Sequence, residues 1–267
     1  MKSKLLGKRL LRATLLFGRR VLGTAFSKVF IWRYTGNQFS CPFCGGHFRR
    51  MKEYKASYHI RGELTSHDTK NYICPNCGSN MRERFMLTFL TDYMNILKPG
   101  MRLLHFSPEQ MVSDFLKRQQ SIEYVTCDID PSKYPRAIKV DITNIQFADE
   151  SFDAVVCSHV LEHIEDDRRA MRELHRILKV NGWALIIVPI YGERTFEDPE
   201  LDFNGRKRMY GIGDHMRMNG LDFALKLSDA GLSVNIHTID DVPGAYVDRS
   251  VKSPHLEADK YLFFCKK

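Results

Sequence analysis

The chain has 267 residues, 43% of them hydrophobic, and it carries 40 Lys and Arg against 32 Asp and Glu. This length and apolar content exclude a disordered protein and are typical of one full core with a small additional unit. The formal net charge of +8 comes from the first 35 residues, which hold nine Lys and Arg and no acidic residue, so the remainder has a net charge of −1. The basic charge therefore belongs to one short segment and not to the body of the protein.

The cysteines and the apolar runs indicate where the protein works. Four of the seven cysteines form two Cys-x-x-Cys pairs, and the other three lie in apolar, strand-like runs. This usage is typical of metal-bound and buried thiols in a reducing compartment and predicts a cytoplasmic protein. No run reaches the roughly 18 apolar residues of a membrane-spanning helix. Three arginines also interrupt what would be the apolar core of a secretory signal.

Residues 1–36 have the pattern of a basic amphipathic helix. Ten apolar side chains between positions 6 and 29 fall on one side of a helical wheel, and six Lys and Arg fall on the other. Such a helix over residues 1–31 can associate with an anionic membrane surface. Two alternatives stay open, a helix that packs on the protein's own core and a mitochondrial targeting peptide.

Two near-copies of a Cys-Pro-x-Cys-Gly motif follow within residues 37–82. Cys41 and Cys44 form the first pair, and Cys74 and Cys77 form the second after 29 intervening residues. Each turn can direct two thiolates at one ion, and the glycine after it permits the backbone conformation of a tight knuckle. Four sulfur ligands fill a tetrahedral site, so the sequence predicts a zinc ribbon with a structural Zn²⁺.

The stretch between the two cysteine pairs mixes basic and aromatic side chains. Arg49, Arg50 and Lys52 lie close to Phe48 and Tyr54 in the sequence, and such a mixture can provide phosphate and stacking contacts to RNA. A solvated β-hairpin with ordinary strand aromatics explains the same residues and is the interpretation that we favour. RNA stays open as an alternative partner.

From residue 83 to residue 267, predicted strands and helices alternate. Helices are expected over 82–97, where Pro99-Gly100 follows, from Pro108 onward, and over 221–230. The alternation is typical of a Rossmann-like, doubly wound α/β domain with a mostly parallel, seven-stranded sheet. The expected strands are 102–106, 122–129, a short stretch before 141, the apolar run after 151, 184–189, 233–240 and 261–265.

Two segments in the middle of this domain carry a family resemblance. Residues 151–163 read Ser-Phe-Asp-Ala-Val-Val-Cys-Ser-His-Val-Leu-Glu-His, and residues 173–183 read Glu-Leu-His-Arg-Ile-Leu-Lys-Val-Asn-Gly-Trp, a helix expected to end at Asn181-Gly182. Together they form a βαβ unit and resemble class I S-adenosylmethionine (SAM)-dependent methyltransferases of type 11. The resemblance covers most of the domain and implies a SAM-binding fold whose last strand enters antiparallel.

The resemblance implies a cofactor loop after the first strand, and here the chain departs from the family. The expected Gly-x-Gly-x-Gly is replaced by Leu-His-Phe-Ser-Pro-Glu over residues 104–109. A subgroup of zinc-ribbon methyltransferase-like proteins has a similar turn. By position, His105, Ser107 and Glu109 would contact SAM, and the helix from Pro108 would direct free N–H groups at it.

Further cofactor contacts are implied at the ends of the next strands. Asp128, with Asp130 as a fallback, corresponds to the acidic residue that binds the ribose, since a carboxylate offers acceptors to a vicinal diol. Ile129 is a further expected cofactor contact. Asp141 and Ile142 match the loop in which an aspartate meets the adenine amino group and an apolar neighbour covers the ring. The alternative is that Asp128 and Asp141 are turn and cap residues.

Candidate groups for the chemistry follow the fourth strand. Ser158 corresponds to a position near the methionine end of SAM. His159 and His163 have the intrinsic pKa of a general base toward a hydroxyl or an amine. Alternatively, Glu162 and His163 only cap and orient the turn.

A polar insertion over residues 191–219 separates the fifth strand from the next helix. The resemblance implies that such a segment forms a lid over the substrate. Asp198, His215 and Arg217 are therefore candidates for substrate contact, and His215 is a further candidate base. A solvated loop is the alternative.

The sequence as a whole predicts a cytoplasmic SAM-dependent methyltransferase with a structural zinc ribbon and an N-terminus that associates with a membrane. The acceptor is expected to be a small molecule or a glycan, and a saccharide or lipid-linked compound would suit a membrane surface. One alternative is an RNA methyltransferase that binds RNA through the ribbon, which the near-neutral body disfavours. The other is a non-catalytic scaffold, because the loop glycines are missing.

Overall fold

The computed structural model describes residues 31–66, 69–134, 136–242 and 258–267. The basic segment predicted to contact a membrane, residues 1–31, lies outside the described residues except for Ile31. Among the helices within those ranges, none is long and apolar enough to cross a membrane.

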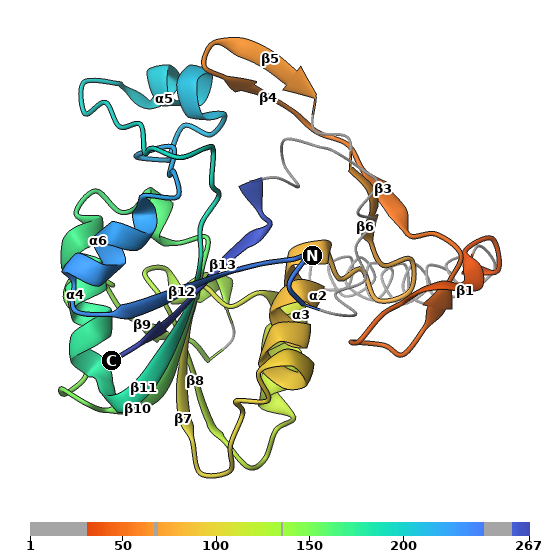
Figure 1. Ribbon diagram of the computed structural model, residues 1–267, viewed down its shortest axis with the longest axis horizontal. Coiled ribbons are helices and arrows are strands. Elements are labelled where there is room, and N and C mark those ends of the chain that lie inside the picture. The colour runs from red at the N-terminus through yellow and green to blue at the C-terminus, as the bar shows by residue number, and fades with distance from the viewer. Residues whose placement is uncertain (1–30, 67–68, 135, 243–257) are drawn as a thin grey trace, which may run out of the picture.

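A seven-stranded sheet forms the centre of the larger domain (Figure 1). Its strand order is β12-β13-β11-β10-β7-β8-β9. The pairs from β11 to β9 are parallel, whereas β13 runs antiparallel to both of its neighbours. The predicted doubly wound sheet with an antiparallel last strand is confirmed. The strands are β7 (Arg102–Phe106), β8 (Glu123–Asp128), β9 (Ile138–Lys139), β10 (Phe152–Ser158), β11 (Leu178–Ile187), β12 (Ser233–Thr238) and β13 (Tyr261–Lys266).

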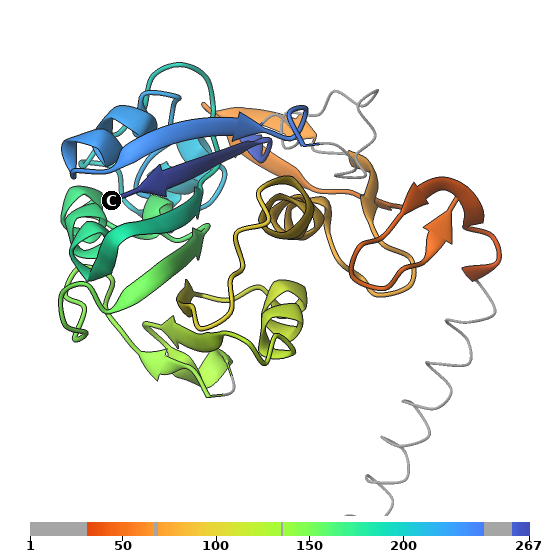
Figure 2. The ribbon, with the colours of Figure 1, turned by 60° about the horizontal axis from the view of Figure 1, so that its bottom comes forward.

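Helices cover both faces of the sheet (Figures 1 and 2). Val155 and Cys157 of β10 belong to the core under α4 and α6, and Ala154 and Val156 belong to the core under α2 and α3. A central parallel strand is therefore apolar on both sides, which explains its continuous apolar run in the sequence. The helices are α2 (Met81–Thr88), α3 (Gln110–Lys117), α4 (Asp167–Ile177) and α6 (Phe223–Asp229).

Two predicted helix boundaries differ from the structure. The helix expected over 82–97 is α2 followed by the π-helical turn η1 (Phe89–Tyr93). The helix expected to end at Asn181-Gly182 already ends at Ile177, because Leu178 is fully buried and pairs with Phe152. Asn181, with a φ of 64°, instead lies in a bulge within β11, where the pairing register shifts before Trp183.

The residues before α2 form a separate small unit of short antiparallel pairs. Its pairs are β1 (Thr35–Ser40) with β2 (His47–Phe48), β3 (Lys52–Tyr54) with β6 (Thr69–Ile73), and β4 (Ser57–Ile60) with β5 (Glu63–Ser66). The hairpin favoured for the stretch between the cysteine pairs is thus present as β4 and β5. It reaches the insertion after β11, which contains α5 (Phe203–Tyr210), as Figure 1 shows. The backbone N–H of Arg61 donates to the carbonyl of Met209 over 2.8 Å.

Candidate active site and metal centres

The four cysteines of the small unit come together at one point. Cys41 Sγ lies 3.6 Å from Cys77 Sγ, and Cys44 Sγ lies 3.8 Å from Cys74 Sγ, with all four sulfur atoms within 4.8 Å of one another. Zinc–sulfur bonds of about 2.3 Å in a tetrahedron separate the sulfur atoms by about 3.8 Å. The observed spacing therefore fits one Zn²⁺ ion.

The two knuckles that carry these cysteines have the same backbone geometry. The N–H of Gly45 donates to the carbonyl of Cys41 over 2.8 Å, and the N–H of Gly78 donates to that of Cys74 over 3.1 Å. Both glycines have the positive φ, 64° and 81°, that disfavours other residues. The buried Ser79 hydroxyl lies 3.2 Å from Cys77 Sγ and can stabilise a thiolate there.

A cavity opens at the carboxyl ends of β7 and β8, on the edge where sheets of this type bind ligands. Five residues that the sequence predicted as cofactor contacts line it together with apolar neighbours. The lining consists of Phe106, Ser107, Asp128, Ile129, Val140, Asp141, Ile142, Val160 and Ile164. The cavity therefore combines two carboxylates with apolar walls, a composition suited to a ribose and a flat heterocycle.

Ser107 shows how the loop turns without its glycines. It adopts a φ of 45°, a left-handed conformation that glycine adopts more readily than other residues. Its hydroxyl lies 2.5 Å from Asp128 Oδ2, and Asp128 Oδ1 accepts the N–H of Asp130 over 2.7 Å. These contacts fix the buried carboxylate while leaving it further acceptor positions toward the cavity.

The opposite wall of the cavity comes from the ends of β8 and β9. Ile129 is 59% exposed, and a ligand bound in the cavity would cover it. Asp141 Oδ1 accepts both the N–H and the hydroxyl of Thr143 over 2.8 Å. The cap role that was the alternative for Asp141 is thus present, and the residue also lines the cavity.

The other three predicted cofactor residues are outside this lining. His105 is fully buried between Tyr124, whose hydroxyl lies 2.8 Å from Nδ1, and Glu109, whose carboxylate lies 3.0 Å from Nε2. Burial alone would raise the pKa of Glu109, but His105 and Arg82 hold that pKa at about 2. Ser158 is buried at the end of β10. His105 and Glu109 therefore support the loop from the α2 and α3 side of the sheet.

His159 lies between two buried carboxylates. Its Nδ1 is 3.1 Å from Glu162 Oε1, and its Nε2 is 3.4 Å from Asp259 Oδ1. Both carboxylates are 0% exposed. Burial alone would raise the pKa of Glu162, but the neighbouring His159 imidazole holds it below its ordinary value. The two carboxylates can compensate a positive charge placed between them.

Sequence reasoning missed two members of this cluster, Arg82 and Asp259. Arg82 Nη1 lies 3.6 Å from Asp259 Oδ2, and its Nε lies 4.0 Å from Glu109 Oε1. Burial and the charge of Asp259 also raise the pKa values of Tyr72 and Tyr191. An arginine next to a cysteine knuckle and an aspartate before the last strand were the available signals, and neither one indicates where its side chain points.

Many polar atoms of this cluster lack hydrogen bonds. Among the residues that the structure describes, no hydrogen-bond partner is found for Arg82 Nε, Ser158 Oγ or His159 Nε2, nor for either carboxylate oxygen of Glu162 and Asp259. A buried polar atom without a partner costs about 1–3 kcal/mol. The concentration of such atoms at one strand edge indicates a polar ligand site.

The two remaining candidate bases lie together beside Glu162. The rings of His163 and His215 are edge to face, with centroids 4.8 Å apart. His215 is 3% exposed, and burial lowers its pKa to about 4, so it is neutral at neutral pH. The insertion reaches this position because the N–H of Met216 donates to the carbonyl of Glu162 over 2.8 Å.

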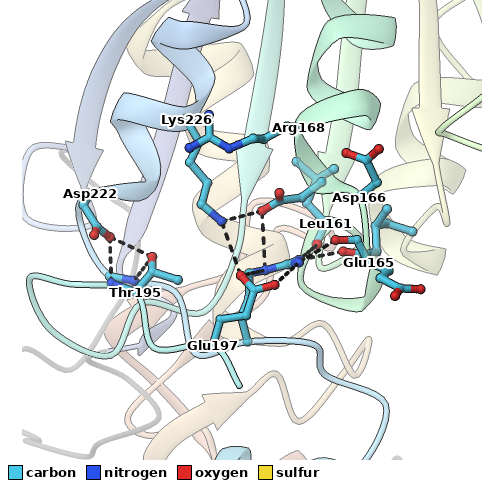
Figure 3. Close-up of polar contacts among 12 residues, drawn as sticks. Leu161, Glu165, Asp166, Arg168, Thr195, Glu197, Asp222 and Lys226 are labelled. Carbon is cyan, nitrogen blue, oxygen red and sulfur yellow. Dashed lines mark hydrogen bonds and ion pairs between the residues drawn. The ribbon is translucent and has the colours of Figure 1, made fainter. Parts of the chain in front are cut away.

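The other insertion candidates have structural partners. The Arg217 guanidinium is 1% exposed and donates to the carbonyls of Ile164 and Glu165 over 2.6 and 2.8 Å. It also donates to both oxygens of Glu197 over 3.0 Å, and Figure 3 shows Glu197 beside Lys226. The expectation that Arg217 contacts substrate is wrong, because its donors hold the insertion against the turn after β10.

The comparisons with known proteins concern the same segment. Residues 107–186 match the family model described as a methyltransferase domain. This match runs from Ser107 to β11 and includes Asp128, Asp141 and the residues of the turn after β10. It leaves out the four-cysteine unit and the insertion. The match to this family model supports the prediction of a SAM-dependent methyltransferase.

Curated proteins are similar to this chain over part of their length. The demethylmenaquinone methyltransferase of Corynebacterium glutamicum (strain R) is 28% identical over 109 residues, which are 36% of this chain and 47% of that protein. The uncharacterized methyltransferase YcgJ of Bacillus subtilis (strain 168) is 39% identical over 59 residues, 22% of each chain. The chain thus matches about half or less of the length of these relatives.

A solved SAM-dependent methyltransferase from Archaeoglobus fulgidus is also similar. It is 16% identical, with a TM-score of 0.46, and the match covers 69% of this chain and 94% of that one. The identification of the fold rests on the strand order and directions described above and not on this score.

Proposed function

We propose that this chain is a SAM-dependent methyltransferase that acts on a small-molecule acceptor. The observation that carries the proposal is the cavity at the ends of β7, β8 and β9, which combines Ser107, Asp128 and Asp141 with apolar walls. SAM, when bound, supplies an activated methyl group on a sulfonium sulfur.

In this proposal the residues of the cavity hold the nucleoside part of the cofactor. Asp128 accepts from the ribose hydroxyls, and its buried position makes these charge-assisted hydrogen bonds strong. Ile129 and Ile142 cover the adenine, and Asp141 accepts from its amino group. Ser107 holds Asp128 in place through its hydroxyl.

The acceptor is assigned to the polar cluster around His159. Nδ1 of His159 faces Glu162, which orients the ring, and Nε2 takes the proton of the acceptor. Asp259 and Arg82, 3.6 Å apart, offer opposite charges to a polar acceptor. Small-molecule acceptors also fit the name of the relative that acts on demethylmenaquinone.

The predictions of a saccharide, a lipid-linked compound or RNA as acceptor have less structural support. A saccharide or lipid-linked acceptor depended on the membrane segment, which lies outside the described residues, so it stays a prediction. For the RNA alternative, Arg50 already stacks 5.4 Å from the Tyr34 ring, and Lys55 pairs with Glu53 over 3.3 Å. These contacts favour the hairpin interpretation over RNA binding.

We also propose that the four cysteines bind one structural Zn²⁺. The sulfur separations support it, as does the lack of an open ligand position in a four-thiolate site. The ion would hold the small unit together and take no part in methyl transfer.

The test is a calorimetric titration of the zinc-loaded protein with SAM and with S-adenosylhomocysteine. Asp128→Ala should weaken both by about ten- to a hundredfold, since charge-assisted hydrogen bonds are lost. Asp229→Ala, which removes an exposed carboxylate from α6, is the matched control and should bind normally. If neither ligand binds the unmodified protein, the scaffold alternative replaces this proposal.

A further inference from the structure

Glu162, His163 and His215 form a second cluster of side chains that resembles a metal site. One ligand atom from each residue lies within 4.8 Å of the others. Glu162 and His163 come from the 3-10 turn η3 (Leu161–His163) at the end of β10, and His215 comes from the insertion. Tertiary contacts therefore bring together two segments that are distant in the sequence.

Several buried polar atoms of this cluster have no hydrogen-bond partner among the described residues. Glu162 is 0% exposed. Its Oε1 lies 3.1 Å from Nδ1 of His159, but neither carboxylate oxygen has a hydrogen bond of good geometry within the described ranges. Nδ1 of the buried His215 is also without a hydrogen-bond partner there. A cation between this buried carboxylate and the buried imidazole would stabilise both.

The third candidate ligand, His163, contacts a backbone carbonyl through one ring nitrogen, as metal-binding histidines commonly do. Nδ1 of His163 lies 3.3 Å from the carbonyl oxygen of Asp214, which can only accept, so Nδ1 carries the proton. This leaves the lone pair on Nε2. A backbone carbonyl on the second ring nitrogen fixes the tautomer and the ring orientation of a ligating histidine.

We propose that Glu162, His163 and His215 bind a divalent first-row transition-metal ion at the edge of the candidate active site. Two imidazoles and one carboxylate suit Zn²⁺, Co²⁺, Fe²⁺ or Mn²⁺ better than Ca²⁺ or Mg²⁺, which prefer sets made only of oxygen. Three protein ligands leave at least one coordination position open.

The open position has a consequence for the acceptor. The cluster adjoins His159, whose Nδ1 is 3.1 Å from Glu162 Oε1. A bound ion would therefore hold an acceptor oxygen, such as a phenol or diol hydroxyl, and lower its pKa. This consequence, though not the metal site, rests on the proposed function.

The test is a titration of the protein with Co²⁺ after its four-cysteine site has been filled with zinc. We expect one Co²⁺ per chain, with the visible ligand-field bands of nitrogen and oxygen ligands and without thiolate charge-transfer bands. His215→Ala and His163→Ala should each weaken binding at least about tenfold. His163 is the safer variant for folding, because its side chain is 34% exposed.

His59→Ala is the matched control, since it removes an exposed histidine of β4 that lies outside the cluster. It should leave the Co²⁺ spectrum unchanged. The proposal is overturned if Co²⁺ enters only the thiolate site, or if both cluster variants bind Co²⁺ as tightly as the unmodified protein.

A SAM titration of the same samples separates this proposal from the proposed function. Asp128→Ala should weaken SAM binding by about ten- to a hundredfold and keep the Co²⁺ site. SAM binding without Co²⁺ uptake would overturn the metal site alone, whereas Co²⁺ uptake without SAM binding would support the metal site and overturn the methyltransferase.

Discussion

The four-cysteine unit and the central sheet are stabilised in different ways. The buried apolar cluster of the unit consists of Cys41, Phe48, Met51 and Cys74. Two of these four residues, Cys41 and Cys74, are themselves candidate metal ligands. Each face of the sheet buries a cluster several times larger. Because stabilisation scales with buried apolar area, the sheet can fold on its own core, whereas the apolar cluster around the cysteines is too small to fold without further contacts, which include the packing of Tyr72 in the sheet's core cluster. Under the two proposals, the structural zinc stabilises the four-cysteine unit, and the cofactor cavity belongs to the sheet.

Removal of the zinc should give the largest effect. Structural zinc sites contribute about 10–16 kcal/mol in small peptides at neutral pH. Cys74→Ser should therefore lose the ion and increase amide hydrogen exchange throughout β1 to β6, while β7, β10 and β11 remain protected. Hydrogen-exchange mass spectrometry and the zinc content measure both parts.

Cys127→Ser is the matched control, since Cys127 is buried in β8, outside the four-cysteine cluster. Its zinc content should be normal. If Cys74→Ser increases amide hydrogen exchange equally in the unit and in the sheet, the two regions unfold together. That result would contradict the expected difference between them.

The link between the two regions should give the next largest effect. Arg84 of α2 is 0% exposed and donates to the carbonyls of Ser79 over 2.6 Å and Tyr72 over 3.1 Å. Arg84→Met leaves these acceptors without their donor, and we expect a loss of about 3 kcal/mol in the free energy of unfolding. Urea denaturation measures it.

Arg172→Met changes an exposed arginine of α4 in the same way and serves as the control. It should cost less than about 0.5 kcal/mol. An Arg84→Met protein as stable as this control would mean that Arg84 does not join the unit to the sheet.

The sheet domain should also show an acid dependence of its own. The pKa of Glu109 is about 2 in the folded protein, against an ordinary value of 4.5, so its contribution is present above pH 4.5 and is lost as the pH falls toward 2. Between pH 5 and pH 3 this loss is about 2 kcal/mol. Denaturation followed by tryptophan fluorescence at several pH values measures it.

Glu109→Gln should be less stable than the unmodified protein at pH 5, and its stability should fall less between pH 5 and pH 3. The same acid dependence in both proteins would mean that Glu109 is not the group responsible.

The smallest effect is expected at the surface. Arg168 and Asp229 pair over 3.0 Å between α4 and α6, but their side chains are 53% and 63% exposed. Arg168→Ala should lower the free energy of unfolding by no more than about 0.5 kcal/mol, because solvent and salt screen the pair. Denaturation at low and high salt checks this, and a loss above about 1 kcal/mol would contradict it.

The cofactor side of the site was predictable because it depends on strand ends. Asp128 and Asp141 follow predicted strands of a parallel sheet, and the carboxyl ends of such strands meet at one edge. Ser107 was predicted from the family resemblance of its loop, and it turns the chain there with a φ of 45°. His105, one residue before the end of its strand, points to the other face, because side chains alternate along a strand.

The reacting side of the site was only partly predictable. His159 and His163 could be named from the turn after β10, but Arg82 and Asp259, 177 positions apart in the sequence, carry no local pattern that brings them together. Arg217 was misjudged for the same reason, since the carbonyls that it binds belong to a turn about 50 residues earlier.

The sequence by itself determined the order of strands and helices, the two cysteine knuckles and the polar strand ends, because periodicity and short spacings act over a few residues. Only the tertiary structure decided which buried charges face one another and that His215 joins Glu162 and His163. Those contacts depend on how distant segments pack, and their electrostatic energies depend on burial that no local sequence pattern specifies.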